Sequence, residues 1–220
     1  MYHHYSIKCV RVLSFLNMNT APFHVIMGLV MTMHIVYGGS FNPPTLAHRR
    51  VVDFLDRALE PEKFSIVPVG NVYGKKDLAP DQHRLEMLKV AFRDKRHVII
   101  SDVELFDREY KGTFETLKRL EDDTPIAFVI GADHLLGLHR WKHIHKMLHQ
   151  YRFIVLNRNQ QSLKHIIERD AFLRYYRSRF ILFESFEADE SASSFRRTRD
   201  AALLDEKVYD YIEANQLYKG

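Results

Sequence analysis

The stretch HIVYGGSFNPPTLAH, residues 34–48, decides how the folded part of this chain begins. Four strand-forming residues lead into two glycines, and two prolines then precede a helical pattern that starts near Thr45. Glycines let the backbone approach a ligand closely, while prolines stiffen the loop. The N–H groups at the helix start form a site for an anion, and His48 follows about one turn into the helix. The stretch therefore predicts a phosphate-binding corner between a strand and a helix; a plain corner with a capping Thr45 and a surface His48 is the alternative.

The alternation of strand and helix continues along the rest of the chain. Short apolar runs are predicted as strands buried on both faces, at 34–37, 64–69, 97–101, 126–130, 153–156 and 180–183. Helix-period stretches alternate with them at 46–59, 81–92, 113–120, 134–148 and 163–177, and a last one lies at 194–217. The pattern predicts an α/β fold: a Rossmann-like, doubly wound parallel sheet with helices on both faces and a C-terminal helical segment. Ligands bind such sheets beyond the carboxyl ends of the strands, so the loops there are the candidate site.

Composition indicates an ordinary soluble globular protein with a mild positive charge. The 220 residues are 46% hydrophobic and 27% charged, and the formal net charge is +4, which suits one sizeable α/β domain. Lysines and arginines are scattered rather than clustered, so no nucleic-acid partner is expected. Cys9 is the only cysteine, which excludes a disulfide framework and a cysteine-based metal site. We therefore expect a reducing, cytoplasmic location.

Residues 1–32 differ from the rest of the chain. They contain no Asp or Glu and several methionines, and the apolar run at 21–36 is interrupted by a proline and two histidines. That run is too short and too broken for a membrane span, and no clean apolar core precedes a small-residue cleavage site. We expect a loose extension or the product of an upstream start codon, followed by one domain over 33–220. An acid-poor transit peptide is the alternative.

Several stretches resemble one enzyme family. GGSFNPPTLAH is similar to the nucleotide-binding motif of the nucleotidyltransferase superfamily, in which a glycine-aromatic-proline loop leads to a T/H-x-G-H element. Further stretches resemble, in the right order, the nicotinate (nicotinamide) mononucleotide adenylyltransferases: IVPVGNVYGKK, QHRLEMLKVAF, GTFETLKRL, FVIGADHLLGLHRWKHI, FIVLNR, SASSFRR and VYDYIEANQLY. The likeness runs from Met33 to Tyr218.

The resemblance implies a nicotinate-nucleotide adenylyltransferase of NAD biosynthesis. Such an enzyme joins ATP, bound with Mg²⁺, to nicotinate mononucleotide or nicotinamide mononucleotide, and it releases the dinucleotide and pyrophosphate. The mononucleotide phosphate is already a competent nucleophile, so the protein has to position it and neutralise charge on the phosphoryl oxygens. The sequence leaves open which acceptor is preferred and whether the protein forms a homo-oligomer.

Three residues are catalytic candidates by this resemblance. His48 would donate to the α-phosphate oxygens in the transition state. Arg197 would hold the β- and γ-phosphates, because its planar fork binds two oxygens at once. Lys76, with Lys75 beside it, would meet the phosphate of the mononucleotide. Arg196 is the alternative to Arg197, because SASSFRR places two arginines together.

Other residues after the predicted strands are binding candidates. By the same resemblance, Asp133 would accept from the ATP ribose and Trp141 would stack on the pyridine ring. Phe41 and its neighbours would line the ATP phosphates, and Thr113 and Arg158 are assigned less specifically. The full set is Gly38, Gly39, Ser40, Phe41, Thr45, Thr113, Gly131, Asp133, Trp141, Arg158 and Ser194.

Other interpretations compete with these assignments. A helix cap would also explain Asp133, and core packing would also explain Trp141. Thr45 also fits a sister enzyme such as phosphopantetheine adenylyltransferase, and an inactive nucleotide-binding regulator is the second rival. His145 and His149 are four residues apart, but no third ligand is evident, so no protein-bound metal is predicted.

Overall fold

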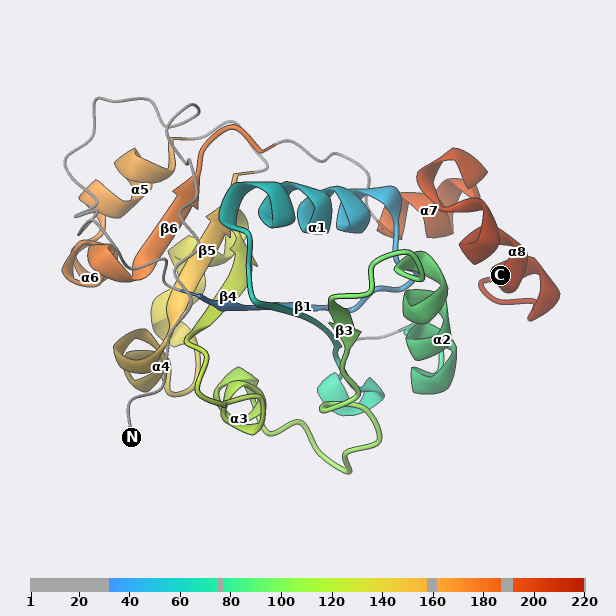
Figure 1. Cartoon of the computed structure of the whole chain (residues 1–220), viewed down its shortest axis with the longest axis horizontal. Helices are drawn as coiled ribbons and strands as arrows, with labels where there is room; N and C mark the ends of the chain where they lie inside the picture. The colour runs from blue at the N-terminus through green and yellow to red at the C-terminus, as the bar shows by residue number, and fades with distance from the viewer. Residues whose placement is uncertain (1–31, 75–76, 158–161, 187–191, 220) are drawn as a thin grey trace, which may run out of the picture. The chain divides into compact units, whose positions relative to one another are not determined.

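A six-stranded parallel sheet forms the centre of the folded unit (Figure 1). The computed structural model describes residues 32–74, 77–157, 162–186 and 192–219. The strands are β1 (His34–Gly39), β2 (Lys63–Pro68), β3 (Val98–Ile100), β4 (Ile126–Gly131), β5 (Arg152–Leu156) and β6 (Phe180–Phe183). Their order is β3-β2-β1-β4-β5-β6, and every neighbouring pair is parallel. The predicted doubly wound α/β fold is therefore confirmed.

Helices connect the strands and cover both faces of the sheet. The α-helices are α1 (Leu46–Leu59), α2 (Asp81–Ala91), α3 (Thr113–Arg119), α4 (Ile144–Gln150), α5 (Leu163–Arg169), α6 (Ala171–Tyr175), α7 (Ala192–Thr198) and α8 (Glu206–Ala214). Short 3₁₀-helices are η1 (Asn71–Tyr73), η2 (Ala132–Arg140), η3 (Arg177–Arg179) and η4 (Ala201–Leu203). Figure 1 shows α1 on one side of the sheet and α3 and α4 on the other. No helix in the described part of the chain has the length and apolar character that a membrane span needs.

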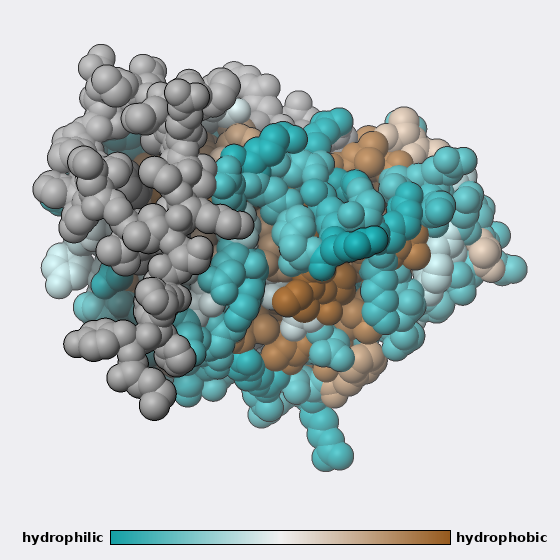
Figure 2. Space-filling view, in the orientation of Figure 1, coloured by the Kyte–Doolittle hydropathy of each residue, from teal (hydrophilic) through white to brown (hydrophobic). Residues whose placement is uncertain are grey.

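The strand side chains alternate between two hydrophobic cores. In β1, Ile35 and Tyr37 belong to the core under α1, whereas Val36 belongs to the core on the opposite face. In β5, Ile154 and Val155 divide between the cores in the same way. Successive side chains of a strand point to opposite faces, so a strand covered on both faces must be apolar throughout. In the space-filling view, hydrophobic side chains fill the region between α1 and α2 (Figure 2).

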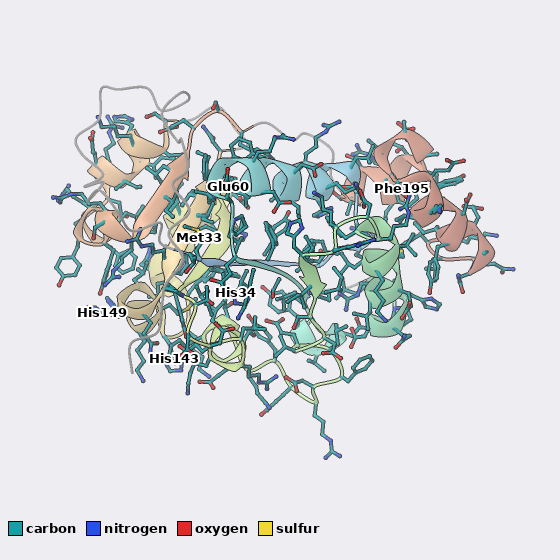
Figure 3. All side chains as sticks on the ribbon, viewed as in Figure 1. Met33, His34, Glu60, His143, His149 and Phe195 are labelled. Carbon is teal, nitrogen blue, oxygen red and sulfur yellow. The ribbon has the colours of Figure 1, made fainter. Side chains whose placement is uncertain are left out.

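Helix α1 has the bounds predicted from the sequence, and it crosses the sheet from the site edge to the opposite edge. Its buried residues include Val51, Val52 and Leu55, one stripe of an amphipathic helix. The helix ends at Glu60, whose φ of +45° breaks the helical backbone. Figure 3 shows Glu60 near Met33, which precedes β1. The start of α1 therefore lies at the carboxyl ends of the strands, where ligands bind in this architecture.

Two predicted helices are wrong in extent. The stretch 134–148 consists of η2 and α4, separated by residues that include His143 with φ +62°. The stretch 163–177 breaks at Asp170, whose extended backbone ends α5. The Asp170 side chain accepts a hydrogen bond from the backbone N–H of Leu173 and so caps α6. The helical periodicity of the sequence continues across both breaks, and for this reason it predicted one helix where the structure has two.

The predicted helix at 194–217 is also wrong in extent. It is divided into α7, η4 and α8. Arg199 has a φ of +56°, which ends α7. Asp200 and Asp205 then cap η4 and α8, because their side chains accept from backbone N–H groups two residues further on. The division is visible at the C-terminal end of the chain in Figure 1.

The domain boundary expected near residue 33 remains a prediction. The chain divides into units at 1–32 and 33–220. Residues 1–31 lie outside the described residues, so the expected extension has no structural description.

Candidate active site

The strand order places a change of winding direction between β1 and β4. The chain builds outward from β1 through β2 to β3, and then from β4 through β5 to β6. Loops that leave β1 and β4 therefore turn to opposite faces, and proteins of this architecture bind ligands at such a switch point, beyond the carboxyl ends of the strands. Gly38 and Gly39 end β1, and Gly131 ends β4. The predicted glycines thus lie at the two strand ends on either side of this switch point.

His48 is oriented by Thr45 at the start of α1. Thr45 is the N-cap of the helix, and it is 2% exposed. Its backbone N–H donates to Nδ1 of His48 over 2.9 Å, and its Oγ1 lies 2.9 Å from the same nitrogen. A backbone N–H can only donate, so Nδ1 is an acceptor, and the neutral ring carries its proton on Nε2. The ring therefore carries its N–H on the side that faces away from Thr45.

Phe41 supports the histidine ring from inside the core. The whole residue is 0% exposed, so the contact of Phe41 with ATP stays a prediction. The Phe41 ring meets Tyr37 edge-on at 5.4 Å and lies 4.9 Å from the His48 ring, centroid to centroid. A Cβ on Gly39 would lie 3.1 Å from the Phe41 ring, so this glycine allows a close approach. The loop conformation and the histidine position are thus coupled by packing.

Asp133 and Trp141 lie on and after the 3₁₀-helix that follows β4. The Asp133 side chain is 60% exposed, and its carboxylate lies 3.8 Å from Nε2 of His134. The N-cap residue of η2 is Gly131 and not Asp133, so helix capping does not explain Asp133. Trp141 is partly buried against the core on the sheet face opposite α1, and its ring centroid lies 6.4 Å from that of Phe128. Core packing therefore accounts for the buried part of the Trp141 side chain, and the rest of the side chain is accessible to solvent.

Helix α7 brings one of the two candidate arginines against the loop after β1. Arg196 donates from Nη1 to the carbonyl of Asn42 over 2.5 Å. Arg197 is exposed, and Ser194 is partly exposed. Figure 3 shows Phe195 of α7 at the end of α1 opposite to Glu60, which is the carboxyl edge of the sheet. The structure therefore distinguishes the arginines: Arg196 holds protein backbone, and Arg197 is presented to solvent.

Two polar residues that the sequence did not single out stabilise this loop. Asn42 is 1% exposed and bonds to the backbone of residues 77–79. Arg84 is fully buried and donates to the carbonyl of Ser40 and to that of Ala79, each over 3.0 Å. Burial lowers the pKa of Arg84, while the nearby Asp81 carboxylate opposes that shift. From the sequence alone, an arginine in a helix is expected to be exposed, so the sequence did not indicate that Arg84 is buried.

The remaining predicted residues fall into two groups. Thr113 begins α3, and its hydroxyl lies 3.1 Å from that of Tyr110. The predicted Lys75, Lys76 and Arg158 lie outside the described residues.

The structure also places the histidine pair on α4. Nδ1 of His145 bonds to the hydroxyl of Tyr176 over 2.9 Å, and the His149 ring packs on the same tyrosine. Figure 3 shows His149 of this helix, and His143 just before it, away from the labelled Phe195. Among the described residues, no group of three or more His, Cys, Asp or Glu side chains could hold a metal ion.

Known proteins with similar sequences are nucleotidyltransferases. A family model described as cytidylyltransferase-like matches residues 36–198. A probable nicotinate-nucleotide adenylyltransferase from Acholeplasma laidlawii is 35% identical over 193 residues, which cover 85% of this chain and 98% of the relative. A relative of the same name from Clostridium acetobutylicum is 30% identical over 199 residues, with 86% and 100% coverage.

A solved structure shares the fold. The Plasmodium falciparum nicotinic acid mononucleotide adenylyltransferase complexed with NaAD has a TM-score of 0.68 at 20% identity, and the match covers 85% of this chain and 97% of that chain. The fold, the family model and the sequence relatives together identify an α/β nucleotidyltransferase. Within that class, the chain belongs to the nicotinate-nucleotide adenylyltransferase family.

Proposed function

We propose that this enzyme transfers the adenylyl group of ATP to nicotinate mononucleotide, in the biosynthesis of NAD. An oxygen of the mononucleotide phosphate attacks the α-phosphorus of ATP, and the bond from that phosphorus to the oxygen bridging to the β-phosphate breaks. The products are the dinucleotide and pyrophosphate. The carrying observation is His48 at the start of α1, whose Nδ1 accepts from the backbone N–H of Thr45, so that the ring carries its proton on Nε2.

His48 stabilises the charge that builds up on the α-phosphate. The helix start supplies backbone N–H groups at the same place, and its dipole favours an anion. Preorganised donors of this kind are effective because they need no rearrangement during the reaction. Gly39 and Ser40 bring backbone close to the phosphates, and Gly38 belongs to the same turn. Thr45 acts by orienting the histidine rather than by touching the substrate.

Two further cations neutralise the phosphates in this proposal. Arg197 holds the β- and γ-phosphates from α7, with Ser194 beside it; support comes from its exposure next to Arg196, which contacts the loop after β1. Lys76 meets the acceptor phosphate, and support comes from Asp77, whose carbonyl accepts from Asn42. Mg²⁺ enters as part of the ATP substrate and neutralises the triphosphate that it accompanies.

The remaining assignments concern the ribose and the pyridine ring. Asp133 accepts from the ATP ribose hydroxyls, which its exposed carboxylate beside Gly131 supports. Trp141 stacks on the pyridine ring with its accessible face. Thr113 and Arg158 are further candidates for contact with ATP or the acceptor. A cytoplasmic location and a homo-oligomer stay predictions.

The deciding experiment is pyrophosphate release from ATP and Mg²⁺ with separate acceptors. Nicotinate mononucleotide should support the fastest turnover, nicotinamide mononucleotide should be slower, and phosphopantetheine should be inactive. Turnover with phosphopantetheine only would assign the chain to the sister enzyme. ATP binding without turnover on any acceptor would favour the nucleotide-binding regulator.

A further inference from the structure

The last described residues of the chain reach back to the loop that follows β1. The hydroxyl of Tyr218 lies 2.7 Å from Oδ1 of Asn42, although 176 residues separate them in sequence. The Tyr218 ring meets Phe195 of α7 edge-on, with the centroids 6.2 Å apart. Arg199 donates to the Leu217 carbonyl over 3.1 Å and packs over the Phe195 ring. These contacts hold the tyrosine in place, with a φ of +58° that a bulky residue rarely adopts.

Asn42 is the point at which three segments meet. Its Nδ2 donates to the carbonyl of Asp77 over 2.8 Å, and its Oδ1 accepts from the N–H of Ala79 over 2.9 Å. Its own carbonyl accepts from Arg196 of α7. The loop that carries the ATP-phosphate contacts is thereby joined to residues 77–79, which follow the predicted acceptor loop. Tyr218 adds the C-terminal segment to this junction.

The direction of the Tyr218 bond follows from the other bonds of Asn42. The N–H of Ala79 identifies the amide oxygen of Asn42, so the tyrosine hydroxyl must donate to it. Burial raises the pKa of Tyr218, against the opposing effect of Arg196 and two other arginines. The hydroxyl therefore keeps its proton, and the bond persists over the physiological range of pH.

We infer that Tyr218 is a positioning residue for adenylyl transfer, which acts through Asn42 to hold the ATP-phosphate loop in register with the acceptor segment. The inference rests on the proposed function. Tyr218 touches neither substrate in this view. It supports the side chain of Asn42, which bonds to Asp77 and Ala79, and a misplacement of about 1 Å at the reacting atoms can cost about 100-fold in rate.

This role predicts a separation between turnover and binding. Each loop still binds its own substrate when the link is loosened, so KM for ATP and for nicotinate mononucleotide should change less than about twofold. Alignment of the two substrates is lost, so kcat should fall by about 10-fold. A merely structural hydrogen bond would lower the unfolding temperature and leave kcat unchanged at temperatures well below it.

The experiment compares Tyr218→Phe with Tyr211→Phe in the full chain. Tyr211 provides a matched control, because its hydroxyl also links the C-terminal helix α8 to another element, with a 3.0 Å bond to Nδ1 of His83 on α2. Both substitutions keep the ring and remove one hydroxyl, so neither should prevent folding. Initial rates of pyrophosphate release are measured over a matrix of both substrates, together with thermal unfolding.

The expected result is a fall in kcat for Tyr218→Phe with little change in either KM, and wild-type kinetics for Tyr211→Phe. Wild-type kcat in Tyr218→Phe, or an equal fall in both variants, would overturn the positioning role while leaving the proposed function intact. A rise in KM without a fall in kcat would also overturn it. An inactive wild-type enzyme would overturn the proposed function, and this inference with it.

Discussion

The backbone N–H of Thr45 and Nδ1 of His48 are joined by a hydrogen bond of 2.9 Å, which fixes which ring nitrogen of the histidine can donate. Thr45 is 2% exposed, so the Thr45 end of this bond is buried. The Phe41 ring limits the histidine from a second side, at 4.9 Å. The orientation of the histidine ring is therefore set by its own helix start and by the core.

Substitution of His48 should reduce turnover, and the reduction should depend on where the new side chain places a hydrogen-bond donor. His48→Ala should lower kcat by about 100-fold or more, as expected for the loss of one transition-state donor. His48→Gln should retain more activity than His48→Asn, because the Gln amide can reach the place of Nε2 and the Asn amide that of Nδ1. Pyrophosphate release measures the rates, and circular dichroism checks folding. Full activity in a folded His48→Ala would remove this residue from the mechanism.

The two arginines of α7 should separate into a binding residue and a structural one. Arg197→Ala should raise KM for ATP by about 10-fold or more, the value of one hydrogen bond to a charged group. Arg196→Ala should change that KM less and lower the free energy of unfolding by about 1–2 kcal/mol, because its bond to Asn42 is lost. Urea unfolding and ATP saturation curves measure both. The reverse ranking of KM would move the phosphate contact to Arg196.

Substitution of Trp141 should weaken binding of the acceptor and leave binding of ATP unchanged. Stacking on an aromatic ring contributes about 1–3 kcal/mol, so Trp141→Ala should raise KM for nicotinate mononucleotide by about 10-fold while KM for ATP stays within twofold. Leu136→Ala is the control, because Leu136 lies on η2 and is 61% exposed. A loss of stability in Trp141→Ala with both KM values unchanged would reduce the tryptophan to core packing.

The sequence predicted the sheet well because buried parallel strands leave a clear signal. All six strands were located, and the bounds of α1 were found at Leu46–Leu59. The failures are helices that stop within a continuous helical period. Asp170 and Asp205 were available as N-cap signals, since each caps a helix with its side chain, but periodicity outweighed them. Backbone turns such as that at His143 depend on packing and carry no comparable signal.

The site was less predictable than the fold, for a physical reason. Motif residues such as His48 lie on strand ends and helix starts, which topology brings to one edge. The residues that hold the loops act over long separations: Arg84 bonds to Ser40, and Tyr218 bonds to Asn42. Such contacts exist only after the chain has folded, and a buried arginine looks like a surface residue in the sequence.

Gly70 should tolerate no side chain. A Cβ at this position would lie 2.4 Å from the carbonyl oxygen of Glu104, which is backbone and cannot rotate away. Gly70→Ala should therefore lower the free energy of unfolding by about 1–3 kcal/mol, as overpacking does. Gly137→Ala is the control, because its Cβ would approach only the end of the Arg140 side chain, at 3.2 Å. Equal stability of the two variants in urea would show that the backbone at Gly70 moves easily.

Acid should destabilise the fold through His34, which lies 4% exposed in β1 with Nε2 bonded to the hydroxyl of Ser65 over 2.7 Å. Burial lowers the pKa of His34 below its ordinary value of 6.5, although the Asp122 carboxylate opposes this. As the pH decreases below 6.5, His34 takes up a proton in the unfolded chain, whereas in the folded chain it does so only at a lower pH. The free energy of unfolding therefore falls as the pH decreases through this range, and His34 adds no pH dependence well above it.

Urea unfolding between pH 7.5 and 5.5 measures this effect. The His34→Val/Ser65→Ala double variant removes both polar partners, so its stability should depend less steeply on pH than that of the wild type. His165→Gln is the control for the loss of a histidine at an exposed position, on α5. Equal slopes in the wild type and the double variant would mean that other groups account for the acid sensitivity.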